Sequence, residues 1–219
     1  MKSLYKAGIL LFLLAVPVFI FVFLKSFGRN NYELPVYYEE GVISSLSNCN
    51  FNTGTHTIPD FQFSSHTNKS VSGDILENKI TVVDFFFTSC PNICPVMSKQ
   101  LSRVQEKFKD NNSVNIISIT VDPEHDTPEV LQTYAERYQV NNTNWVFLTG
   151  NKEKIYSLAR CGFILPVEDG DGSPEDFIHS EKFILVDGQK RIRGYYDGTD
   201  REDVDRLILE INVLLSQKS

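Results

Sequence analysis

Between residues 57 and 219, short apolar runs alternate with segments in which apolar residues recur at helical spacing. The runs are rich in β-branched and aromatic residues, which predicts strands, at 58–63, 80–87, 114–121, 145–148, 183–186 and 191–196. The helical spacing predicts helices at 97–108, 127–138, 153–159 and 204–215. Because strands and helices alternate, we expect an α/β fold with a mixed sheet flanked by helices. Asp187 and Gly188 indicate a hairpin between the last two strands, which adds an antiparallel edge.

A longer apolar run, at residues 7–24, contains no charged residue. At roughly 1.5 Å per residue, a helix of this length just spans a hydrocarbon core of about 30 Å. A cleaved signal peptide has a shorter apolar stretch and a small-residue cleavage site, which residues 25–28 do not offer. We therefore expect a single transmembrane helix with its flanks at 1–29, a tether at 30–56 and a folded domain at 57–219. The domain would lie on the periplasmic, or extracytoplasmic, side of the cytoplasmic (inner) membrane.

The charge balance narrows the choice of partners. The 219-residue chain has 21 Lys and Arg against 28 Asp and Glu, a formal net charge of −7. An acidic surface disfavours contact with nucleic-acid phosphates, so we expect no nucleic-acid partner. Four cysteines are too few for a disulfide-based fold, so a hydrophobic core must stabilise the domain.

Two cysteines lie where the predicted strand 80–87 passes into a helix. In the segment FFFTSCPNICPVM, Cys90 and Cys94 are four positions apart, and Pro95 places the helix start near Cys94. Unpaired N–H groups at a helix N-terminus stabilise thiolates, which are nucleophiles in disulfide exchange and soft metal ligands. A purely structural disulfide is disfavoured, because so small a loop gains little from closure. A strand, a reactive cysteine pair and a helix in this order form the thioredoxin-like arrangement.

His179 is the candidate third ligand of a metal site. It precedes the strand 183–186, which in a thioredoxin-like sheet lies beside the cysteine-bearing strand, so both reach the same end of the sheet. The other histidines, His56, His66 and His125, have no such context. Two thiolates and one imidazole favour copper, because sulfur selects Cu(I) and the added nitrogen tolerates Cu(II). A structural zinc site would require a fourth protein ligand.

Three segments resemble the signature motifs of the Sco (SenC/PrrC-type) copper-chaperone family. They are FFFTSCPNICPVM at 85–97, ITVDPEHDTPEVL at 119–131 and FIHSEKFILVD at 177–187, and the resemblance covers roughly residues 57–216. It implies a thioredoxin/peroxiredoxin-like fold tethered to a bacterial cytoplasmic or mitochondrial inner membrane. It also implies a role in assembling the binuclear copper centre of cytochrome c oxidase subunit II, with Cys90, Cys94 and His179 as copper ligands. Asn92 stands where the family often has Asp, so a charge-based role does not carry over to that position.

Two functions stay open. A metallochaperone, which is not an enzyme, would hold copper on Cys90, Cys94 and His179 and pass it to acceptor thiolates by ligand exchange. A thiol–disulfide oxidoreductase would use Cys90 and Cys94 as the attacking and resolving cysteines, and would reduce cysteines of the oxidase subunit or of another partner. We favour the metallochaperone. Exchange of His179 for Ala separates the two, because only the metal site needs the imidazole.

The remaining cysteines, Cys49 and Cys161, leave two alternatives. Cys161 follows a helical pattern and is either simply buried or, outside the cytoplasm, disulfide-bonded to Cys49.

Acidic residues gather in two predicted loops. Asp122, Glu124 and Asp126 precede the helix 127–138, where we favour turn formation and helix capping over a role in docking a partner. Residues 168–176 resemble a calcium loop only faintly, because proline occupies the position that requires glycine. We expect a solvated loop there that leads to the candidate ligand at position 179.

Overall fold

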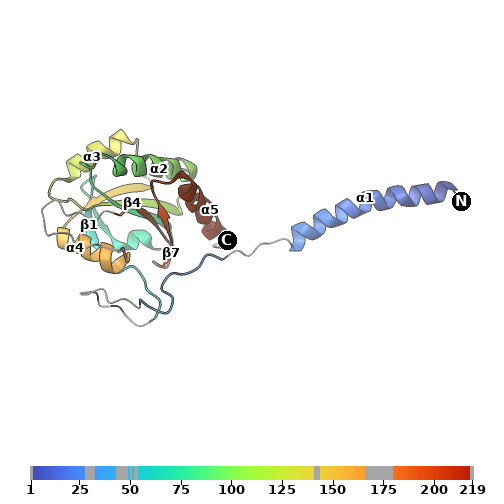
Figure 1. Ribbon diagram of the computed structural model, residues 1–219, viewed down its shortest axis with the longest axis horizontal. Helices are drawn as coiled ribbons and strands as arrows, with labels where there is room; N and C mark the ends of the chain where they lie inside the picture. The colour runs from blue at the N-terminus through green and yellow to red at the C-terminus, as the bar shows by residue number, and fades with distance from the viewer. Residues whose placement is uncertain are drawn as a thin grey trace. The chain divides into compact units, whose positions relative to one another are not determined.

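The computed structural model describes residues 2–27, 33–42, 49, 51, 54–140, 144–165 and 180–217. The chain divides into two compact units, Met1–Glu33 and Leu34–Ser219. The first unit holds helix α1 (Lys2–Phe27) (Figure 1). In the part of the chain that the structure describes, no helix combines the length and the apolarity needed to cross a membrane. The predicted transmembrane helix at 7–24 is therefore helical but is not confirmed as a membrane span.

The second unit is built on a seven-stranded sheet of order β2-β1-β5-β4-β3-β6-β7 (Figure 1). The strands are β1 (Gln62–Ser65), β2 (Ser70–Ser72), β3 (Ile80–Phe86), β4 (Val114–Thr120), β5 (Trp145–Thr149), β6 (Lys182–Val186) and β7 (Ile192–Asp197). The central strands β3, β4 and β5 pair in parallel, and all other pairs are antiparallel. The predicted α/β class, with a mixed sheet and a late hairpin, is confirmed.

Helices cover both faces of this sheet (Figure 1). They are α2 (Ile93–Phe108), α3 (Pro128–Arg137), α4 (Lys152–Ser157) and α5 (Arg201–Gln217), with the shorter η1 (Gly73–Leu76) and η2 (Leu158–Gly162). From β3, Val82 joins the core formed with α2, α3 and α5, whereas Val83 joins the core formed with α4 and η2. Every residue of β3 is buried, as its continuous apolar run predicts. The cysteines therefore follow a strand that is buried along its whole length.

The first strand lies later in the chain than the sequence predicts. Ile58 is buried and its N–H donates to the carbonyl of Lys190, so the segment before Gln62 packs on the unit without joining the sheet as a strand. Residues before position 57, predicted as a tether, also contact the folded unit. Leu34 is buried in the core and the N–H of Tyr37 donates to the carbonyl of Ile192.

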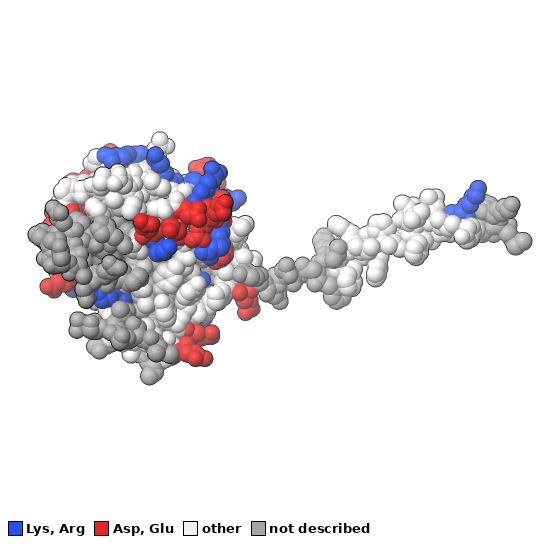
Figure 2. Space-filling view, in the orientation of Figure 1, with Lys and Arg blue, Asp and Glu red and all other residues white. Residues whose placement is uncertain are grey.

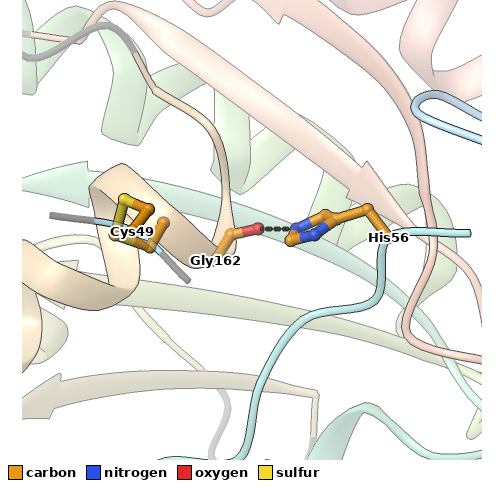
Figure 3. The surroundings of a disulfide bond; sticks show 4 residues. Cys49, His56 and Gly162 are labelled. Atoms are coloured by element: carbon orange, nitrogen blue, oxygen red, sulfur yellow. Dashed lines mark hydrogen bonds between the residues drawn. A yellow bond between two sulfur atoms is a disulfide. The ribbon is translucent and has the colours of Figure 1, made fainter. Parts of the chain in front are cut away.

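A disulfide joins Cys49 to Cys161, with their Cα atoms 5.5 Å apart (Figure 3). The bond fastens the lead-in to η2, the short helix that contains Cys161. Beside it, His56 Nε2 donates a hydrogen bond of 2.7 Å to the backbone carbonyl of Gly162. Of the two alternatives for Cys161, the disulfide is the one present.

Candidate metal centre

Of the two free cysteines, Cys90 lies in the connection between β3 and α2, and Cys94 lies in the first turn of α2. Helix α2 begins at Ile93, one position before the expected start, and its N-cap residue Asn92 makes no side-chain capping hydrogen bond. The Cys90 sulfur accepts instead from the backbone N–H of Cys94 at 3.4 Å, and the Cys90 N–H donates to the carbonyl of Phe87 at 3.3 Å. The turn therefore places the first sulfur over the N-terminus of the helix and next to the second cysteine.

The two thiols differ in their readiness to ionise. Burial raises the pKa of Cys90, but hydrogen bonds from Cys94 and from the backbone of Asn92 and Ile93 outweigh it, so the pKa is lowered from its ordinary value. Burial raises the pKa of Cys94 far above its usual range, against a backbone hydrogen bond at Phe87. Cys90 is half-buried, whereas the Cys94 side chain is only 5% exposed. Hydrogen bonding thus favours the thiolate form of the more exposed Cys90, whereas burial favours the protonated form of Cys94.

A buried carboxyl group, not expected from the sequence, lies in β3, the strand that leads into the cysteine turn. Asp84 of β3 accepts from Ser118 Oγ at 2.5 Å, and Ser118 Oγ accepts from Trp145 Nε1 at 2.9 Å. Burial raises the Asp84 pKa to about 7, although the Ser118 bond lowers it. Its charge adds to the rise of the Cys94 pKa. The signal in the sequence was an acid inside an otherwise apolar strand run.

Residues that precede β6 line a small cavity of about 20 Å³ together with the two cysteines. Its lining combines residues of the cysteine turn and α2 with the residues just before β6: Phe85, Phe87, Cys90, Ile93, Cys94, Met97, Ser180 and Glu181. His179, the predicted third ligand, lies outside the described residues, and so does the acidic loop 168–176. Among the residues described, no group of three or more His, Cys, Asp or Glu is arranged to hold a metal ion. Of the predicted ligands, Cys90 and Cys94 are the two that lie among the described residues, and both line this cavity.

The acidic residues of the loop before α3 differ in their surroundings. Thr127 caps α3, and its side chain accepts from the N–H of Val130. Glu124 is exposed, whereas Asp126 is fully buried and contacts the cysteine turn. Helix capping thus accounts for the hydrogen bond of Thr127 but not for the burial of Asp126.

Known proteins resemble this chain over most of the folded unit. The family model described as SCO1/SenC matches residues 51–215, which include both free cysteines. The "SCO1 protein homolog" of Bacillus subtilis (strain 168) is 31% identical over 194 residues, covering 88% of this chain and 91% of that protein.

Solved structures show the same similarity. BsSco, described as a member of the Sco family of cytochrome c oxidase assembly proteins with a disulfide switch, matches with a TM-score of 0.63 and 32% identity, over 73% of this chain and 94% of that one. ScoI of Arabidopsis thaliana with copper bound matches with a TM-score of 0.59 and 28% identity, over 73% of this chain and 98% of that one. The expected thioredoxin-like Sco fold is therefore confirmed.

Proposed function

The chain belongs to the SCO1/SenC family, and from this premise we propose that it is a copper metallochaperone for the assembly of cytochrome c oxidase. The observation that carries the proposal is the pairing of two free cysteines at one helix N-terminus, one accessible and easily ionised, the other buried beside it. Thiolates are the ligands that Cu(I) prefers. Copper is the cargo of the protein, and its acceptor is the binuclear copper site of oxidase subunit II.

His179 is the proposed third ligand. Its sequence neighbours Ser180 and Glu181 line the cavity that also contains both cysteine side chains. An imidazole added to two thiolates gives a site that tolerates both copper oxidation states. Binding requires the reduced pair, so the redox state of Cys90 and Cys94 controls loading, and ligand exchange with acceptor thiolates completes delivery.

Copper titration of the full-length chain with its Cys90–Cys94 pair reduced tests this proposal. We expect about one copper ion per chain, bound through thiolate and imidazole. Cys90→Ala, Cys94→Ala and His179→Ala should each abolish or sharply weaken binding. His56→Ala is the matched histidine control and should bind as wild type, since His56 bonds Gly162 beside the disulfide and is not among the residues that line the cavity at the cysteine pair. Full copper stoichiometry in the double cysteine variant would refute the proposal.

The thiol–disulfide oxidoreductase is the second candidate, because the two thiols have the properties of an attacking and a resolving cysteine. Cys90 is accessible with a lowered pKa and Cys94 is buried with a raised one. The variant His179→Ala distinguishes the functions. Lost oxidase assembly with normal dithiol exchange supports copper delivery, whereas normal assembly supports the oxidoreductase.

We also propose that α1 attaches the chain to a membrane, with the folded unit on the extracytoplasmic side. Side chains at positions 10–14 are between 62 and 73% exposed and residues 7–24 carry no charge, so this part of α1 presents apolar groups all round, and the described part of the helix is mostly white in Figure 2. A helix that is apolar on every side needs a nonaqueous environment. The Cys49–Cys161 bond supports the compartment, because disulfides persist where conditions are oxidising.

A further inference from the structure

We infer that Asp126 is a positioning residue for the cysteine turn, acting through Thr88. The inference rests on the proposed function only in naming copper as the ion bound there. Asp126 lies in the loop between β4 and α3, and Thr88 lies in the connection that leads from β3 to Cys90. The two residues are 38 positions apart, so only the folded chain brings them together.

The Asp126 carboxylate is fully buried and makes hydrogen bonds on both oxygens. It accepts from the backbone N–H of Thr88 at 3.0 Å and from the Thr88 hydroxyl. The Thr120 hydroxyl and His125 Nδ1, the latter at 3.0 Å, also donate to it. A buried carboxylate is tolerated only with such a set of donors, so its partners show what it fixes.

Thr88 needs this partner because the strand ladder ends just before it. The last backbone bond of the β3–β4 pairing runs from the N–H of Val121 to the carbonyl of Phe86. Beyond that point the Thr88 N–H has Asp126 as its acceptor, and the next bond of the turn is that from Cys90 to Phe87. Asp126 therefore ties the turn to the sheet two residues before the first thiol.

Helix capping does not account for Asp126, since Thr127 caps α3 and the Asp126 carboxylate makes no bond to that helix. Its charge-assisted bonds to Thr88 hold the Cys90 sulfur where the N–H of Cys94 reaches it. Partners behind the ligands of a metal site typically change metal affinity on the order of 10- to 100-fold. The same positioning sets the balance between dithiol and disulfide.

The test compares Asp126→Ala, Asp126→Asn and Thr88→Val in the full-length chain, with Glu124→Ala as control from the same loop. Two quantities are measured: copper affinity, and the equilibrium in which the Cys90–Cys94 dithiol and oxidised glutathione give the disulfide and two reduced glutathiones. Mass mapping of the peptide that contains both cysteines follows the second, separately from Cys49–Cys161. We expect Asp126→Ala to change both by on the order of tenfold or more. Asp126→Asn, which keeps an acceptor for the Thr88 N–H, should restore most of the loss, and Glu124→Ala should match wild type.

A folded Asp126→Ala variant with wild-type values for both quantities overturns the inference, as does an Asp126→Asn variant that loses as much as Asp126→Ala. If Asp126→Ala does not fold, Thr88→Val decides: it keeps the backbone N–H but loses the hydroxyl, and a change in the same direction supports the inference, while unchanged values contradict it. If wild type binds no copper, the proposed function fails, and the glutathione equilibrium still tests Asp126.

Discussion

At the scale of single residues, identical side chains acquire different chemistry from their depth in the fold. Cys90 and Cys94 are both free thiols, but hydrogen bonds from the start of α2 lower the pKa of the first, and burial raises that of the second. In the copper site that we propose, both cysteines would hold the ion as thiolates, and Cys94, whose pKa is the higher, would release its proton to the solvent on binding.

Asp84 gives a prediction for the dependence of stability on pH. Its pKa rises from 3.8 to about 7, so the folded state keeps a proton that the unfolded chain has lost. The stability that this contributes is complete below the unfolded value and is lost as pH rises through the folded one. Asn cannot ionise and retains the acceptor for Ser118. We therefore expect Asp84→Asn to raise the free energy of unfolding by about 2–4 kcal/mol near pH 8 and by much less near pH 4, as measured by urea unfolding.

Asp187→Asn is the control, for which we expect the opposite change in the free energy of unfolding. Burial raises the pKa of Asp187, but hydrogen bonds from Arg191 and Arg193 outweigh this and lower it. Its charge is therefore stabilising at neutral pH, and Asp187→Asn should be less stable than wild type there. If Asp84→Asn is also less stable near pH 8, then the buried proton of Asp84 does not govern this part of the pH dependence.

At the scale of elements, the disulfide joins the lead-in of the folded unit to a short helix. Cys49 and Cys161 are separated by 112 positions, and the bond ties the lead-in to η2. A loop of this size restricts the unfolded chain strongly. We expect the double variant Cys49→Ser/Cys161→Ser to lose about 2–5 kcal/mol of unfolding free energy in urea.

The matched control is the double variant Cys90→Ser/Cys94→Ser, which removes two thiols that are not joined by a disulfide in this structure. It should change stability much less than loss of the disulfide does. Mass mapping of the unreduced wild-type protein should find Cys49 and Cys161 in one linked peptide pair, and equal stability of the two double variants would contradict the role assigned to this bond.

At the scale of the whole molecule, the apolar α1 and the charged folded unit call for different surroundings. We expect the wild-type chain to sediment with membranes and to resist a high-salt wash. In the full-length chain, Leu13→Lys/Phe21→Lys should move the protein to the soluble fraction, since a lysine in a lipid environment costs about 2.5–3.5 kcal/mol.

Leu209→Lys serves as control, because Leu209 is an exposed apolar residue on α5 at 67% exposure. It should leave the protein in the membrane fraction. A wild-type chain that stays soluble, or an α1 variant that still sediments, would show that α1 does not attach the protein to a membrane.

The local sequence pattern was sufficient to predict an element when the residues of that element alone determine its type and bounds. The apolar run 80–87 became β3, and Pro95 placed the start of α2 within one residue of Ile93. Pattern failed where an element depends on its neighbour. The three-residue β2 (Ser70–Ser72) is mostly polar and exists as a strand because it pairs with β1. Ile58, where the predicted strand begins, is instead buried in the core formed with α4 and η2, and its N–H donates to the carbonyl of Lys190.

The sequence by itself determined the fold class, the cysteine pair at a strand-to-helix turn and the family, because each depends on residues close together in the chain. The assignment of His179 as the third copper ligand remains a prediction from the sequence. Only the tertiary structure decided that Cys49 bonds Cys161, that Asp84 is buried with a raised pKa, and that Asp126 holds Thr88. These facts depend on burial and on hydrogen bonds between residues distant in the chain, which pattern along a sequence does not encode.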